Sequence, residues 1–217
     1  MNDNINVYVI GPQLGYARPI YHKRLVNDIE DADIIVLTGG EDVCPETYNR
    51  ENICSYGSPR RDMFEIAEYK RVRKDQLIMG TCRGAQLLTV LNGGNLVQDV
   101  DNHGIWGTHD MIDKKNNRYE ITSLHHQMCY PFTINPDYYE LLMISAPSRS
   151  SHYTGDGIDS ELIKEYGEPE VILFKNPDEP MALAIQGHPE MMNLDSPTVQ
   201  MFNRLLIKYL NEARERR

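Results

Sequence analysis

Short apolar runs alternate along the chain with longer segments in which apolar and charged positions recur every three or four residues. The runs INVYVI (5–10), ADIIVLTGG (32–40) and QLIM (76–79) predict strands, because each is almost continuously apolar. RDMFEIAEYKRVRK (61–74) and AQLLTVLN (85–92) predict helices. Apolar strands that alternate with helices indicate a parallel sheet covered on both faces.

The second half of the chain predicts further strands, several of them antiparallel, since only a short turn separates the last two. Residues 196–217 predict a closing amphipathic helix, with Ser196 as N-cap and Pro197 at the first helical position. The polar, Gly- and Pro-interrupted stretch 146–170 is typical of a surface insertion or lid. The strand candidates are 118–124, 140–145, 170–174 and 181–186.

Composition narrows the classes of protein that fit this pattern. With 217 residues, 41% of them hydrophobic, we expect one domain over residues 1–217. The formal net charge of -10 argues against a nucleic-acid partner, which needs clustered Lys and Arg. No apolar run of about 18 residues predicts a membrane span, and the first residues do not resemble a secretory signal. We therefore expect a cytoplasmic protein with no membrane partner, whose four cysteines form neither disulfides nor C-x-x-C pairs.

One cysteine lies where a strand is predicted to turn into a helix. In IMGTCRGAQL (78–87), Gly80 and Gly84 flank Cys82, which matches the strand–turn–helix pattern of a nucleophile elbow with cysteine in place of serine. The helix N-terminus that follows would favour a thiolate over a thiol. The alternative is a structural cysteine buried at a tight turn. The two glycines and the two flanking elements favour the nucleophile.

A thiolate nucleophile needs a base, and AIQGHPEMM (184–192) offers one. His188 precedes Pro189, and proline favours an extended conformation in the residue before it. Side chains two positions apart in extended chain share a side, so Glu190 can orient one ring nitrogen of His188 and leave the other for the sulfur. H-P-E alone could be an ordinary turn. Together with a cysteine elbow it predicts a catalytic triad.

These motifs resemble the class I glutamine amidotransferase-like superfamily. Within it, the chain is most similar to the gamma-glutamyl-gamma-aminobutyrate hydrolase type, a family of cysteine peptidases. The resemblance implies an α/β fold: a flavodoxin-like three-layer sandwich with a mostly parallel central sheet. It also implies a nucleophile elbow after a central strand and a small antiparallel β addition. The matching segments are LTGGEDVCPETY (37–48), RDMFEIAEYKRV (61–72), MGTCRGAQLLTVLNGGNLVQDV (79–100), SLHHQ (123–127) and IQGHPE (185–190).

The resemblance also implies the chemistry. Cys82 would be the nucleophile, His188 the general base and acid, and Glu190 the orienting carboxylate, in hydrolysis of a gamma-glutamyl amide through a glutamyl thioester. The backbone amides of Gly40 and Arg83 would form the oxyanion hole.

The resemblance further implies which residues contact the substrate. Gly39, Gln86 and His126 would lie against it. We expect no cofactor and no metal, because His103 and His109 lack further well-spaced ligands in the sequence.

Three functions remain open at the level of sequence. The first is a stand-alone hydrolase of small gamma-glutamyl compounds. The second is a glutaminase that passes ammonia to a separate synthase. The third is a catalytically idle binding protein on the same fold, which the presence of all three triad residue types argues against. Segment 146–170 differs from the family pattern, so the leaving amine stays open. The sequence also leaves the oligomeric state open.

Overall fold

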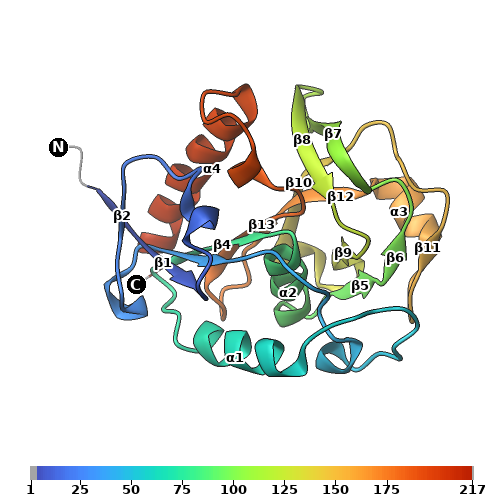
Figure 1. Ribbon diagram of the computed structural model, residues 1–217, viewed down its shortest axis with the longest axis horizontal. Helices are drawn as coiled ribbons and strands as arrows, with labels where there is room; N and C mark the ends of the chain where they lie inside the picture. Colours follow the sequence, from blue (N-terminus) through green and yellow to red (C-terminus); the bar gives the residue numbers. More distant parts are fainter. Residues whose placement is uncertain (1–3, 217) are drawn as a thin grey trace.

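A nine-stranded sheet forms the centre of the computed structural model, which describes residues 4–216 (Figure 1). Its order is β2-β1-β3-β4-β13-β12-β10-β7-β8, parallel from β2 to β13 and antiparallel from β13 to β8. The parallel strands are β1 (Ile5–Ile10), β2 (Lys23–Leu25), β3 (Ile34–Leu37), β4 (Leu77–Thr81) and β13 (Met181–Ile185). The antiparallel strands are β12 (Pro169–Phe174), β10 (Tyr139–Ser145), β7 (Gly104–Asp113) and β8 (Arg118–Leu124).

Helices cover the sheet on both faces, which makes three layers (Figure 1). Helix α4 (Pro197–Arg214) packs on one face through a stripe of apolar residues that recurs every three or four positions, including Phe202, Leu206 and Leu210. Helices α1 (Pro59–Tyr69) and α2 (Arg83–Leu91) cover the other face. Each layer boundary contains one of the two large apolar clusters of the core.

A smaller layer of structure flanks the antiparallel half. Here β5 (Asn95–Val97) pairs with β9 (Met128–Tyr130), and β6 (Asp99–Val100) pairs with β11 (Tyr153–Thr154). The segment 146–170 is less irregular than the sequence suggested, because it also contains helix α3 (Ser160–Tyr166), whose Ile163 is buried beside Tyr130. Short 3-10 helices connect these elements: η1 (Leu14–Ala17), η2 (Ile29–Asp31), η3 (Pro45–Tyr48), η4 (Pro131–Thr133), η5 (Pro136–Tyr138) and η6 (Pro189–Met191).

The predicted fold class is confirmed: an α/β sandwich with a parallel central sheet and an antiparallel addition. The addition is continuous with the main sheet, through β12, β10, β7 and β8. Ser196 caps α4 as expected, since its side chain accepts a hydrogen bond from the amide of Val199. Among the residues described, no helix is both long and apolar enough to cross a membrane.

Candidate active site

Cys82 lies at the junction of β4 and α2, at the carboxyl edge of the parallel strands. Its backbone has φ 51° and ψ -110°, a combination that L-residues rarely adopt. The Cys82 amide donates a hydrogen bond to the Ile185 carbonyl at 2.8 Å, which ties the turn to β13. A Cβ at Gly84 would overlap the Leu37 carbonyl, and one at Gly80 would overlap the Gly84 carbonyl. The two glycines therefore permit the close approach of α2 to the strands that the strained turn requires.

His188 and Glu190 follow β13, the strand beside β4. The Nδ1 of His188 lies 2.7 Å from Oε1 of Glu190, and the Cys82 side chain lies close enough to the imidazole to interact with it. Burial alone would lower the pKa of His188, but the hydrogen bonds and negative charges of Cys82 and Glu190 outweigh it and raise the pKa to about 10. An imidazolium in this position stabilises a thiolate beside it.

The backbone of His188 is fixed by β8. The Thr122 hydroxyl donates to the His188 carbonyl at 2.8 Å and accepts from the His188 amide at 3.0 Å. Gly187 packs so closely against β8 that a Cβ there would overlap Ile121. The antiparallel half of the sheet thus positions the side chain of His188, which lies at the edge of the parallel half.

The Gly39-Gly40 loop lies against the imidazole of His188. A Cβ at Gly39 would be 3.2 Å from Cε1 of His188 and 2.6 Å from the Tyr16 hydroxyl. The Gly39 carbonyl accepts a hydrogen bond from Nη2 of Arg61 at 2.9 Å. Gly40 has φ 148°, which strains an L-residue, and a Cβ there would displace the Arg61 guanidinium, so both the backbone and this contact favour glycine.

Carboxylates on α1 connect this loop to the cysteine turn. The fully buried guanidinium of Arg83 pairs with Asp62 and Glu65. Glu65 also pairs with Arg61 at 2.8 Å, and Arg61 pairs with Glu41 at 2.7 Å. These roles were not predicted from the sequence. Their signal was the spacing in RDMFE (61–65), where Asp62 and Glu65 lie on one face of a helix.

Tyr16, in η1, is a further residue of the site that was not predicted from the sequence. Its ring centroid lies 6.3 Å from that of His188. Burial raises the pKa of Tyr16 to about 12, with a further contribution from the negative charges of Glu190 and Cys82. Its hydroxyl therefore stays protonated and is available as a hydrogen-bond donor. No motif marks this position in the sequence.

Gln86 bonds to the HHQ segment (125–127), and His126 belongs to that segment and contacts two aspartates. Gln86 is buried and its Nε2 donates to the Gln127 carbonyl at 2.8 Å. His126 is half-buried between Asp42, at 2.8 Å, and Asp99, at 3.2 Å. Its hydrogen bond with Asp42 raises the pKa of His126 against the opposing effect of burial.

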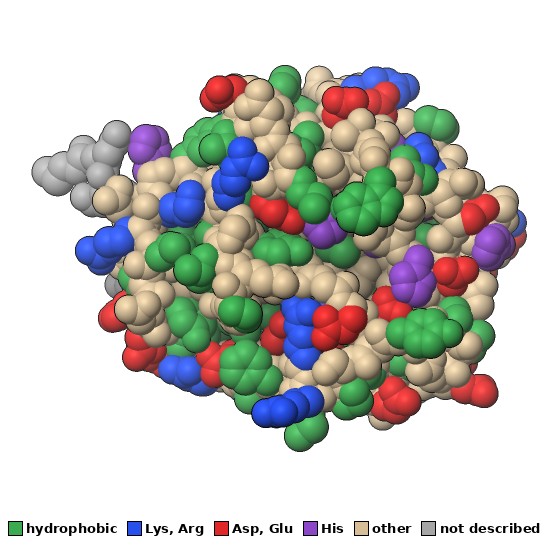
Figure 2. Space-filling view, in the orientation of Figure 1, with side chains coloured by type: hydrophobic (Ala, Val, Ile, Leu, Met, Phe, Trp, Pro, Cys, Tyr) green, Lys and Arg blue, Asp and Glu red, His purple; other side chains and the backbone are tan. Residues whose placement is uncertain are grey.

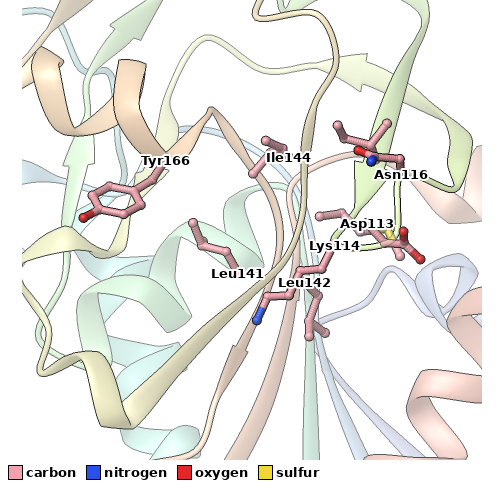
Figure 3. Close-up of a pocket in the computed structure, with 9 residues that line it drawn as sticks. Asp113, Lys114, Asn116, Leu141, Leu142, Ile144 and Tyr166 are labelled. Carbon is pink, nitrogen blue, oxygen red and sulfur yellow. The ribbon is translucent and has the colours of Figure 1, made fainter.

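Figure 2 shows acidic, basic and histidine side chains close together near the middle of the face that it draws. A separate surface hollow of about 340 Å³ lies along β10 and the turn between β7 and β8 (Figure 3). Apolar side chains such as Leu141, Ile144 and Tyr166 line this hollow, and no residue of the triad or of the glycine loop contributes to its lining. This hollow is therefore separate from the cluster around Cys82.

Comparison with known proteins identifies the family of this chain. The family model of peptidase C26 matches residues 19–190. A protein described as glutamine amidotransferase-like, YvdE of Lactococcus lactis subsp. lactis, is 43% identical over 81 residues. That match covers 36% of this chain and only 34% of YvdE. Protein NtpR of Enterococcus hirae is 26% identical over 184 residues, which are 79% of this chain and 72% of NtpR.

Two solved structures share the fold. A protein of Thermoplasma acidophilum that is described as part of a GMP synthase has a TM-score of 0.62 at 17% identity, with 98% of this chain and 97% of that chain covered. PurLQS of Thermotoga maritima has a TM-score of 0.61 at 15% identity, with 95% and 99% covered. Fold and site together define a class I glutamine amidotransferase-like protein. Since the family model spans most of its length, the chain belongs to the peptidase C26 family.

Proposed function

We propose that the protein hydrolyses gamma-glutamyl amide bonds with a triad of Cys82, His188 and Glu190. One observation carries the proposal: a cysteine at a strained strand–helix turn contacts a histidine whose second nitrogen is held by a carboxylate at 2.7 Å. Nucleophile, base and orienting group are then in the order that covalent catalysis needs.

The reaction has two stages. The Cys82 thiolate attacks the delta carbonyl of the substrate, and His188 donates its Nε2 proton to the nitrogen of the leaving amine as the C–N bond breaks. The product of this stage is a glutamyl thioester. His188 then takes a proton from water, whose oxygen attacks the thioester. The C–S bond breaks, glutamate leaves, and the thiolate and the imidazolium are restored.

Two amides would bind the oxyanion that forms in each stage. Arg83 is the first residue of α2, so its N–H has no acceptor four residues earlier within the helix. In the trans peptide between Gly39 and Gly40, the N–H points opposite to the carbonyl that Arg61 holds, and therefore away from α1. We assign Arg83 and Gly40 as the oxyanion donors and Arg61 as the residue that orients Gly40.

Three further residues would contact the substrate. Gly39 supplies a surface free of side chain beside His188. Gln86 offers its amide oxygen to the glutamyl ammonium group, because its nitrogen already bonds Gln127. His126, which is half-buried and bonded to Asp42, would contact the leaving amine.

A release assay tests this function. Purified protein is incubated with glutamine and with a panel of gamma-glutamyl amines, and free glutamate is measured. The proposal predicts glutamate release from at least one substrate by the wild type and none by Cys82→Ala, with both proteins equally folded. Equal release by the two proteins contradicts it.

A second candidate is a glutaminase that delivers ammonia to a separate synthase. The names of the two solved neighbours, one described as part of a GMP synthase and the other as PurLQS, favour it. It predicts slow glutamine hydrolysis by the isolated chain, no preference for gamma-glutamyl amines, and stimulation by a partner. Absence of turnover under every condition would instead favour the third possibility, a binding protein.

A further inference from the structure

A second cluster of buried titratable side chains lies in the antiparallel half of the sheet. His109 is on β7, His103 directly precedes β7, and Glu170 is on β12, which β10 separates from β7 in the sheet order. All three are at most 5% exposed. Nε2 of His109 lies 2.7 Å from Oε1 of Glu170, and Nδ1 of His103 lies 3.8 Å from the same oxygen. Ligand atoms from all three residues lie within 4.8 Å of one another.

Hydrogen bonding indicates which ring nitrogen of His103 is the donor. Its Nε2 lies 3.1 Å from Oε2 of Glu168. Glu168 also accepts hydrogen bonds from the amides of Arg149 and Ser150. Because the oxygens of Glu168 act as acceptors for these donors, Nε2 of His103 is the donor in its hydrogen bond with Glu168. The lone pair of Nδ1 is then the coordinating site that the ring offers.

That lone pair is aimed at a carboxylate. Nδ1 of His103 is buried, and none of residues 4–216 offers it a hydrogen bond. Oε2 of Glu170 is also buried, and no residue of the same range forms a hydrogen bond with it. A buried ring nitrogen and a buried carboxylate oxygen 3.8 Å apart need a proton or a metal cation between them to offset the cost of their burial. A zinc ion with bonds of about 2.0–2.2 Å separates its tetrahedral ligands by roughly 3.4 Å.

We propose that His103, His109 and Glu170 bind a divalent transition-metal ion of the zinc type. Two imidazoles and one carboxylate form a ligand set that suits zinc, with one position left for water. Glu168 would be the outer carboxylate that orients His103, and the His125 ring lies against His103 at a centroid distance of 4.7 Å, tilted by 37°. In the bound state, coordination replaces the hydrogen bond between His109 and Glu170.

The ion would fix β7 to β12 behind the candidate active site. The Glu170 carbonyl accepts a hydrogen bond from the amide of Gln186, two residues before His188. The sequence did not indicate this site, because Glu170 lies 61 residues beyond His109 and only the pairing of the sheet brings them together. The proposal rests on this geometry and is independent of the proposed enzymatic function.

Metal analysis tests the site. The experiment uses the Cys82→Ala protein, because the catalytic Cys82 and His188 could themselves bind zinc. Zinc content is measured after purification, and zinc affinity is measured by competition with a chelating indicator dye. His109→Gln in the same background removes a ligand. His152→Gln is the matched control, since the His152 side chain is 55% exposed and lies outside the cluster.

We expect one equivalent of tight zinc in the Cys82→Ala protein and in the His152→Gln control. His109→Gln should weaken binding by about 10- to 100-fold or more. A chelator should lower the melting temperature of the Cys82→Ala protein and added zinc should restore it, a readout that does not depend on whether His109→Gln folds. Less than a tenth of an equivalent of zinc, roughly, or a melting temperature that zinc and chelator leave unchanged, would overturn the proposal.

Discussion

Arg61 offers a sharp test of how the site is built, because its role is to position the glycine loop. Arg61→Met keeps most of the aliphatic stem but removes the donor to the Gly39 carbonyl, which now bonds Nη2 at 2.9 Å. The carbonyl can then rotate, and with it the Gly40 N–H that we assign to the oxyanion. Glu65 keeps its pair with Arg83, so the fold should survive.

The size of the effect follows from this contact. A hydrogen bond from a charged donor contributes about 1.5–3 kcal/mol, and deletion of a whole oxyanion donor costs about 2.7–4 kcal/mol. Arg61→Met leaves the N–H present but unsupported, so we expect a loss of about 1.5–3 kcal/mol. At about 1.4 kcal/mol per factor of ten, kcat should fall by about 10- to 150-fold. KM should change little, because the interaction strengthens only as the oxyanion forms.

The assay is steady-state glutamate release, with thermal unfolding measured in parallel. Arg60→Met is the matched control, since Arg60 is an exposed neighbour on the same helix. Arg61→Lys, which retains one charged donor, should recover part of the rate. An unchanged kcat in Arg61→Met would refute the reasoning. So would a rise in KM at constant kcat, because Arg61 would then bind substrate instead of holding the loop.

Three further predictions concern the triad. His188→Ala should cost nearly as much kcat as loss of Cys82, while Glu190→Gln should cost less because it only orients the ring; equal losses in steady-state assays would contradict this order. The folded-state pKa of His188, about 10, lies above its usual 6.5, so its contribution to the free energy of unfolding is complete below about pH 6.5 and is lost as the pH rises towards 10. Urea unfolding from about pH 7 to about pH 9 should show this decline, and Glu190→Gln should make it smaller; an equal decline in that variant would rule out the assigned cause. Thr122→Val, which removes both hydrogen bonds to the His188 backbone, should lower kcat by about tenfold, whereas Thr108→Val on the neighbouring strand should leave kcat unchanged.

The sequence pattern was sufficient to predict the structure where the residues that determine it lie within one short segment. The strand at 5–10 was predicted with the bounds it has, because a continuous apolar run ends at Gly11. The turn at Cys82 was predicted for the same reason: both glycines that allow it lie within two residues. The proximity of His188 and Glu190 was also local, since two residues separate them.

Contacts between distant segments could not be predicted in this way. Strand β7 was missed because its partly exposed, irregular pattern buries few residues, among them His109 and Met111, and its pairing with β8 and β10 defines it. The bond from Arg61 to Gly39 spans 22 residues, and that between His109 and Glu170 spans 61. Tyr16 reaches the site from a short 3-10 helix that carries no motif. In each case the sheet order, which no single segment encodes, creates the contact.

The covalent intermediate is the central claim, and its detection is the most direct test. The protein is mixed with a gamma-glutamyl substrate, quenched in acid during turnover, and analysed by intact mass and peptide mapping. The account predicts a mass increase of one glutamyl acyl group on the peptide that contains Cys82, longer-lived in Glu190→Gln if thioester hydrolysis is slowed, and absent in Cys82→Ala. Turnover without any acyl adduct in the wild type, or an adduct of the same size on another residue in Cys82→Ala, would contradict it.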